Sequence, residues 1–230
     1  MGINTINKQY ILFDLDGTIT DSKLGILKSM QYAMNSFGIE IKDEELDSYS
    51  FFLGPPLRDS FEKLKSRFGL HDKDTETAVV KYREYFVPNG MFQNELYPGI
   101  ADLLENLKNN GKAVILATSK VIEYADKILE HFDILKYFDF VGGCEINGLR
   151  SSKEEVILYC LENFGILSDT EKAKAVMIGD RNHDIIGAAK AGIDSIGVLY
   201  GYGSKDELMI GEYKATYLVT DVRELSSLLL

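Results

Sequence analysis

Two aspartates one residue apart follow a short apolar segment near the start of the chain. The segment Tyr10–Thr18 reads YILFDLDGT, and its first four residues have the apolar and aromatic character of a buried strand. Asp14 and Asp16 therefore stand at the carboxyl end of a strand, which is where open α/β sheets bind ligands. A carboxylate there can attack a phosphate ester, hold the metal ion that neutralises it, or transfer a proton. The motif predicts phosphate chemistry.

The two residues after the aspartates predict a turn that faces the same site. Gly17 lets the chain turn sharply while backbone N–H groups of the turn face the site. An ordinary turn or a calcium loop would use similar residues. A calcium loop that begins at Asp14 would need Asp or Asn at its fifth position and Gly at its sixth, where Thr18 and Ile19 stand. We therefore interpret the turn as a substrate-binding loop.

Two further predicted strands also end in polar residues. The strand Val114–Ala117 runs into Thr118, and the strand Val176–Ile178 is followed by Asp180 and Asp184. The carboxyl ends of parallel strands meet along one edge of a sheet, so these side chains are expected beside the first motif. Each also has a structural interpretation, because Thr and Asp commonly cap helices. Thr118 offers a phosphoryl oxygen its hydroxyl and N–H, and the two aspartates offer a metal direct or water-mediated ligands.

The predicted crowding of carboxylates calls for a cation. Two carboxylates about 4 Å apart repel by roughly 4 kcal/mol at an effective dielectric constant near 20. Oxygen ligands without Cys or His suit Mg²⁺, which commonly works with substrate phosphates. The expected magnesium ligands are Asp14, Asp16, Asp180 and Asp184. His183 lies among them, but a single histidine beside carboxylates is a weak indication of zinc.

The elements that position these residues divide the chain in two. Between residues 19 and 93 apolar side chains recur at helical spacing, as at Ile26 and Met30, and no convincing strand appears. From residue 94 strands and helices alternate, which indicates a parallel, doubly wound sheet. We predict an α/β core formed by residues 1–18 and 94–230, with residues 19–93 inserted as a small helical domain.

Composition limits the classes of partner. The formal net charge of −11 argues against a nucleic-acid or anionic membrane surface, since either would repel the protein. Only two cysteines are present, so a reduced cytoplasmic setting is expected. The longest apolar runs are too short to cross a bilayer, and the start has no signal-like sequence.

Taken together, the motifs resemble those of the haloacid dehalogenase superfamily. Asp14-Leu15-Asp16-Gly17-Thr18, the strand end at Thr118, a lysine before the last motif, and Gly179-Asp180 with Asp184 match its four motifs, and the phosphoglycolate phosphatase-like branch is the most similar. The resemblance covers the whole chain and implies a Rossmann-like catalytic core with residues 19–93 as a helical cap. Members often carry Lys-Pro at the third motif, whereas Lys153 here precedes Glu154. Lys120 therefore remains a rival, or a partner, for the phosphate-contacting role.

The resemblance implies a role for each motif residue. Asp14 would attack phosphorus to form an aspartyl-phosphate, and Asp16 would act as general acid and base. Thr118 and Lys153 would hold the transferred group, while Asp180 and Asp184 would bind or orient Mg²⁺. The residues expected to contact substrate are Gly17, Thr18, Ser119, Lys120 and, in the cap, Arg58. Arg58 is equally well explained as a solvated residue at a helix start.

The functional hypothesis is a Mg²⁺-dependent phosphatase for small phosphorylated metabolites. Phosphoglycolate and a nucleoside monophosphate are the leading substrates, and a monomer or homodimer without nucleic-acid or membrane partners is expected. A sugar-phosphate mutase of the same superfamily remains an alternative. So does a non-catalytic phospho-acceptor or binding module, which would not need Asp16 as an acid and base.

Overall fold

The computed structural model describes residues 5–71, 74–146 and 148–230, which form two compact units. One unit contains the residues up to Thr20 together with Leu96–Leu230, and the other is Asp21–Glu95. The first unit is built on a six-stranded sheet whose neighbouring strands are all parallel. Its strands in spatial order are β5 (Phe140–Cys144), β4 (Ala113–Val121), β1 (Tyr10–Phe13), β6 (Ala175–Gly179), β7 (Asp194–Val198) and β8 (Tyr217–Val219).

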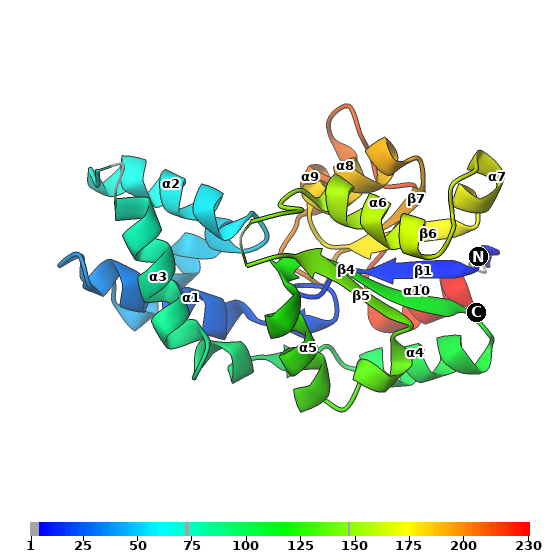
Figure 1. Ribbon diagram of the computed structural model, residues 1–230, viewed down its shortest axis with the longest axis horizontal. Coiled ribbons are helices and arrows are strands. Elements are labelled where there is room, and N and C mark those ends of the chain that lie inside the picture. Colours follow the sequence, from blue (N-terminus) through cyan, green and yellow to red (C-terminus); the bar gives the residue numbers. More distant parts are fainter. Residues whose placement is uncertain (1–4, 72–73, 147) are drawn as a thin grey trace. The chain divides into compact units, whose positions relative to one another are not determined.

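Helices cover both faces of this sheet (Figure 1). One face carries α6 (Lys153–Asn163) and α8 (Asn182–Ala191), and the other carries α4 (Ile100–Asn109), α5 (Ile122–His131) and α10 (Val222–Leu229). Shorter helices are α7 (Asp169–Lys172), α9 (Lys205–Met209) and a 3₁₀ turn at Leu135–Tyr137. Because both faces are covered, the central strands are apolar throughout, and Ile11, Leu12 and Phe13 are completely buried. The predicted doubly wound α/β sheet is confirmed.

The second unit is helical and has its own aromatic core. Phe52 and Phe61 meet edge to face with ring centroids 5.0 Å apart, and Tyr82 stacks on Phe86 at 5.4 Å. Its elements are α1 (Lys23–Asn35), a 3₁₀ helix at Asp43–Phe52, α2 (Leu57–Phe68), α3 (Asp74–Phe86) and a 3₁₀ turn at Gly90–Phe92. The assignment of this unit as a cap over a catalytic core stays a prediction.

The chain passes between the units through two very short strands. β2 (Thr20–Asp21) and β3 (Glu95–Leu96) pair as a separate two-stranded sheet. The sequence pattern showed no strand at β2, because two residues are too few to display an alternation of apolar and polar side chains.

β4 continues further than its apolar pattern predicts. Its register against β5 shifts between Ala117 and Val121, so Thr118 lies inside an irregular extension of the strand. α5 begins only at Ile122, with Val121 as its N-cap residue. The interpretation of Thr118 as a helix cap is therefore wrong, and its buried hydroxyl instead accepts a 3.2 Å hydrogen bond from the Lys120 N–H.

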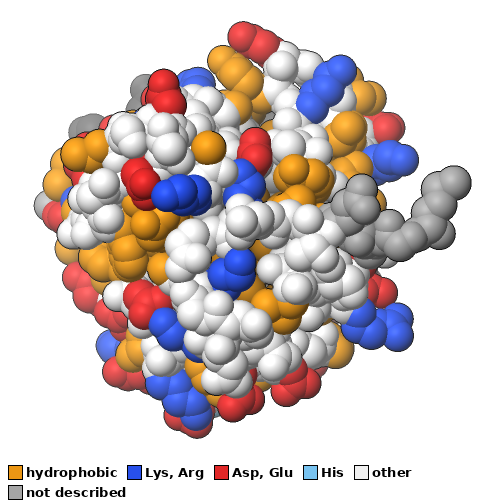
Figure 2. All heavy atoms as spheres, turned by 90° about the vertical axis from the view of Figure 1, so that its right-hand side faces the viewer, with side chains coloured by type: hydrophobic (Ala, Val, Ile, Leu, Met, Phe, Trp, Pro, Cys, Tyr) orange, Lys and Arg blue, Asp and Glu red, His pale blue; other side chains and the backbone are white. Residues whose placement is uncertain are grey.

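No helix in the described ranges combines the length and the apolar character needed to cross a bilayer. On the face displayed in Figure 2, acidic, basic and apolar side chains are interspersed.

The two cysteines differ in burial, which predicts different reactivity. Cys160 is fully buried on α6, and burial raises the pKa of its thiol to about 12, whereas Cys144 is half-buried at the end of β5. At pH 8 the Cys160 thiol stays protonated, and only a thiolate reacts with disulfide reagents. We expect one fast-reacting thiol in the native protein and two in urea, measured by a colorimetric thiol assay. Rapid native labelling of a Cys144→Ser variant would contradict this expectation.

Candidate active site

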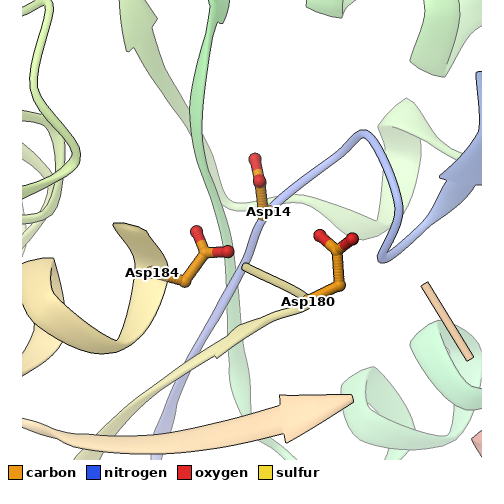
Figure 3. A group of neighbouring side chains, drawn as sticks. All are labelled: Asp14, Asp180 and Asp184. Carbon is orange, nitrogen blue, oxygen red and sulfur yellow. The ribbon is translucent and has the colours of Figure 1, made fainter. Parts of the chain in front are cut away.

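The sheet brings three predicted metal ligands together. β1 and β6 are neighbours, with Phe13 opposite Ile178, so the residues that follow them leave the sheet at the same edge. Asp14 follows β1, Asp180 follows β6, and Asp184 lies in the first turn of α8. All three are buried, each offers an oxygen within 4.8 Å of the others, and Figure 3 shows the carboxylates around a common space. We call these three residues the carboxylate cluster.

The turn after β1 approaches Asp180 closely. Gly17 has a φ of +82°, and a β-carbon at this position would overlap the Asp180 carboxylate, so glycine is required for both reasons. The Gly17 N–H donates to the Thr20 carbonyl at 2.8 Å, and the Thr18 N–H donates to the Leu15 carbonyl at 3.3 Å. These two N–H groups therefore stabilise the turn itself, and the predicted contact of Gly17 and Thr18 with substrate stays a prediction.

Lys153 joins two members of the carboxylate cluster. It is the first residue of α6, and its ammonium lies 2.8 Å from Asp14 Oδ1 and 2.9 Å from Asp184 Oδ1. It also donates to the Ala117 carbonyl at 3.0 Å. The side chain is only 4% exposed, which excludes an ordinary solvated lysine in a first helical turn.

Lys120 contacts the other aspartate of the first motif. Its ammonium lies 2.9 Å from Asp16 Oδ2, and both side chains are largely buried. The Asp16 carboxylate is thus directed toward Lys120 and does not belong to the carboxylate cluster. Ser119, between Thr118 and Lys120, is half-buried. The structure therefore separates the two lysines by partner, with Lys153 at the carboxylate cluster and Lys120 at Asp16.

The pKa shifts show that burial and neighbouring carboxylates both oppose ionisation within the cluster. The pKa of Asp14 is raised above its usual value, with burial as the largest cause; the Lys153 ammonium lowers this pKa and the Asp184 carboxylate raises it. Burial also raises the pKa of Asp180 well above its usual value, with the Asp184 carboxylate as the second cause. Burial alone would lower the pKa of Lys153, but the Asp14 and Asp184 carboxylates raise it above its ordinary value.

The donor set fits a hard divalent cation. Three carboxylates and one ammonium leave two negative charges in excess in a buried space. Among the described residues, the buried Asp16 Oδ1 accepts no hydrogen bond. Asp184 Oδ1 forms an ion pair with the Lys153 ammonium, 2.9 Å away. Oxygen ligands with spare lone pairs are those that Mg²⁺ prefers.

Two predicted features lie outside this cluster. Arg58 is the second residue of α2 in the helical unit, where it forms an ion pair with Glu76, and both side chains are more than half exposed. Its predicted contact with substrate stays a prediction. His183 lies between Asp180 and Asp184 in sequence but does not belong to the cluster of possible metal ligands found among the described residues.

Sequence reasoning missed one contact to the carboxylate cluster. The Tyr202 N–H, in the loop after β7, donates to Asp180 Oδ2 at 2.7 Å. The same rule that selected Asp14 applies here, because β7 is parallel to β6 and ends at the same edge of the sheet. A backbone donor has no side-chain signature, and only the strand end and the two nearby glycines indicated this loop.

Comparison with known proteins places the chain in a family. Residues 11–198 match the model of the haloacid dehalogenase-like hydrolase family. The chain is 38% identical over 219 residues to a 5'-nucleotidase of Pseudomonas aeruginosa, covering 95% of this chain and 94% of that protein. It is 31% identical to a phosphoglycolate phosphatase of Aquifex aeolicus, covering 84% and 85% of the two chains.

Two further similarities bear on function. Tyrosine-protein kinase PtkA of Mycobacterium tuberculosis is 37% identical over 86% of this chain, which spans 64% of that protein's length. The crystal structure of a predicted phosphatase from Clostridium acetobutylicum superposes with a TM-score of 0.86 at 44% identity, covering 96% of this chain and 97% of the other.

The chain belongs to the haloacid dehalogenase-like hydrolase family. Within it, the chain is a phosphatase of the phosphoglycolate phosphatase-like branch.

Proposed function

We propose that the protein is a Mg²⁺-dependent phosphatase that hydrolyses small phosphorylated metabolites through an aspartyl-phosphate on Asp14. The observation that carries the proposal is the carboxylate cluster, in which Asp14 is buried, oriented and paired with Lys153. Asp14, Asp180 and Asp184 would hold the ion with their side chains, and Asp16 with its backbone carbonyl. When bound, Mg²⁺ neutralises the phosphate oxygens and stabilises the charge that develops on them.

The residues of this chain supply nucleophile, acid and charge. Two donors on Oδ1, the Lys153 ammonium and the Leu15 N–H, hold the Asp14 carboxylate in place for attack on phosphorus. As the bond from Asp14 to phosphorus forms, the ester P–O bond breaks and the leaving oxygen takes a proton from Asp16. Water then attacks the phosphoryl group, Asp16 takes the water's proton, and phosphate leaves with Asp14 regenerated.

The two carboxylate oxygens of Asp16 have different surroundings. Its Oδ2 is paired with Lys120, and its buried Oδ1 accepts no hydrogen bond within the described ranges, so Oδ1 is the oxygen available to carry the proton. Thr118 and Lys153 would hold the transferred phosphoryl group, with Lys120 as a partner. Several groups must act together, because hydrolysis of a phosphate monoester can require an acceleration of roughly 10²¹-fold.

The proposed substrates are a nucleoside 5'-monophosphate and phosphoglycolate. Support comes from the relatives named 5'-nucleotidase and phosphoglycolate phosphatase, each similar over most of its length. Arg58 would meet an anionic group of the substrate when the helical unit acts as a cap. A cytoplasmic location and a monomeric or homodimeric state complete the proposal.

A panel of phosphate esters, assayed for phosphate release with Mg²⁺ and with EDTA, tests the proposal. We expect release from at least one of the two substrate classes, and its loss on chelation. Absence of release across the panel, or release that survives chelation, would contradict it.

The similarity to a tyrosine kinase favours a second assay. Transfer of phosphate to a tyrosine-containing acceptor would show a phosphotransferase, and rapid isomer exchange with slow hydrolysis would show a mutase. An Asp16→Asn variant separates these activities from a phospho-acceptor module, because an acceptor that only takes up phosphate does not need Asp16 as an acid and base.

Mg²⁺ binding should raise the Tm of the protein, and most of this rise should depend on Asp180. At Mg²⁺ concentrations about 100 times Kd, binding adds about 2.7 kcal/mol, or roughly 5–10 °C in Tm for a chain of this length. The pKa of Asp180 is higher in the folded protein than in the unfolded chain. Ionisation of Asp180 therefore opposes folding at neutral pH, and this cost disappears as the pH falls below the pKa of the unfolded chain. Asp180→Asn should therefore raise the Tm of the metal-free protein and remove most of the Mg²⁺ response, measured by calorimetry.

The matched control is Asp206→Asn, which removes the same charge from an exposed position on α9. It should leave the Mg²⁺ response of Tm unchanged. An Asp180→Asn protein that gains as much Tm from Mg²⁺ as the wild type would exclude Asp180 as a ligand.

A further inference from the structure

The loop Tyr200–Gly203 follows β7 and reaches the carboxylate cluster from a side that the four sequence motifs do not cover. β7 pairs in parallel with β6, so this loop leaves the sheet beside Asp180. Gly201 and Gly203 both lie against Asp180, and a β-carbon at either position would overlap it. A β-carbon on Gly201 would also overlap the Gly17 carbonyl oxygen. The loop thus packs directly on the aspartate and on the turn after β1.

Asp180 receives one direct hydrogen bond from this loop. The Tyr202 N–H donates to Oδ2 at 2.7 Å, a short distance typical of a charge-assisted bond to a carboxylate. Asp180 is completely buried, so no solvent competes for that oxygen. The bond therefore fixes the rotation of the carboxylate and the direction of the remaining lone pairs.

A second connection runs through Tyr200. Its phenol donates to the Thr18 carbonyl at 3.1 Å, and its ring meets the Tyr97 ring edge to face at 4.8 Å. The Thr18 hydroxyl in turn lies 3.5 Å from Asp180 Oδ1, at the limit of a hydrogen bond. Burial raises the pKa of Tyr200, which keeps the phenol protonated and able to donate. The loop therefore acts on both oxygens of the Asp180 carboxylate. Tyr202 contacts Oδ2 directly, and Tyr200 is linked to Oδ1 through Thr18.

We infer that the loop Tyr200–Gly203 is a positioning element of the metal site, in which Tyr202 and Tyr200 orient the Asp180 carboxylate for the ion. Tyr202 acts through its backbone N–H, and Tyr200 acts through Thr18. The inference rests on the proposed Mg²⁺ site, and it adds a loop that the acidic motifs alone do not include.

Mg²⁺ binding without substrate, measured by isothermal titration calorimetry, tests this inference. Tyr200→Phe removes one hydroxyl and keeps the ring against Tyr97. Loss of a direct partner of a metal ligand typically raises Kd about 10- to 100-fold. Because Tyr200 acts on Asp180 through Thr18, we expect a rise at the lower end of this range, about tenfold. The apparent Mg²⁺ concentration for half-maximal activity should rise in parallel, with kcat at saturating Mg²⁺ close to that of the wild type. Gly201→Ala should weaken binding more, because its β-carbon displaces Asp180.

Tyr10→Phe is the matched control. It removes a tyrosine hydroxyl that donates to Glu171 Oε2 at 3.4 Å, at the opposite end of β1. Its Kd for Mg²⁺ should equal that of the wild type.

The outcomes separate the inference from the proposed function. Equal Mg²⁺ affinities for wild type and Tyr200→Phe would overturn the positioning role alone, even if Gly201→Ala failed to fold. A wild type that binds no Mg²⁺ would overturn both the positioning role and the proposed metal site.

Discussion

Replacement of Asp14 with asparagine is expected to lower the rate of phosphate release on the order of 10⁴-fold or more, as loss of a nucleophile does in other enzymes. The amide has nearly the same shape and can still accept the hydrogen bond from the Leu15 N–H, but it is not nucleophilic. The loss should appear in kcat, measured as phosphate release at saturating substrate and Mg²⁺.

Two controls keep this result interpretable. The Tm of Asp14→Asn without metal should change little, because Asp14 is no longer ionised in a buried position, which offsets the loss of its ion pair with Lys153, and Lys153 keeps its ion pair with Asp184. Asp206→Asn, which alters an exposed aspartate, should retain full activity. An Asp14→Asn enzyme with Mg²⁺-dependent turnover near that of the wild type would exclude the aspartyl-phosphate on this residue.

Replacement of Lys153 with methionine is expected to have the second largest effect. Methionine is similar in length but removes the ammonium that contacts Asp14, Asp184 and the Ala117 carbonyl. Loss of one preorganised charge at a reacting phosphoryl group typically lowers kcat by about 10²- to 10³-fold. Breaking a buried ion pair typically costs about 3–5 kcal/mol, so the metal-free protein should unfold at lower urea concentration.

The pH dependence of this destabilisation has a definite sign. The folded pKa of Lys153 lies above its unfolded value of 10.5, so its stabilisation is fully present below pH 10.5 and is lost only as pH rises through the folded pKa. Lys153 therefore stays charged between pH 7 and 9 in both the folded and the unfolded chain. Its titration should not change the difference in unfolding free energy between wild type and Lys153→Met over this range.

The Lys120→Met variant tests which of the two lysines makes the main contact with the phosphoryl group. Lys120 forms an ion pair with Asp16, whereas Lys153 forms ion pairs with two members of the carboxylate cluster, so loss of Lys120 should affect metal-free stability and Mg²⁺ affinity less than Lys153→Met. A larger loss of kcat in Lys120→Met than in Lys153→Met would assign the main phosphate contact to Lys120 instead.

The order of the acidic motifs along the chain predicted that Asp14, Asp180 and Asp184 meet, but it also placed the Asp16 carboxylate among them, and that carboxylate pairs with Lys120 instead. Asp14 and Asp180 each follow a wholly apolar strand, and parallel neighbouring strands end at one edge of the sheet. Asp184 is four residues further on and is carried to the same place by the first turn of α8. Strand-end position thus predicts proximity from local sequence alone, while the roles of these residues in metal binding stay predictions.

The partners of each group were decided by the tertiary structure. Lys153 reaches Asp14 because the start of α6 packs against α8, a contact between segments that no local pattern relates. The turn hydrogen bonds of Gly17 and Thr18, and the pairing of Lys120 with Asp16, also depend on side chains and carbonyls fixed only after folding.

Local sequence therefore determined the apolar strands, the alternation of strands and helices, and the acidic residues at the strand ends. Hydrophobic periodicity is a property of neighbouring residues, so it can be recognised without coordinates. Only the tertiary structure showed which carboxylate each lysine pairs with. It also showed that the loop Tyr200–Gly203 packs against Asp180. Those contacts join residues more than 20 positions apart through backbone groups and buried charges, whose partners depend on the packing of whole elements.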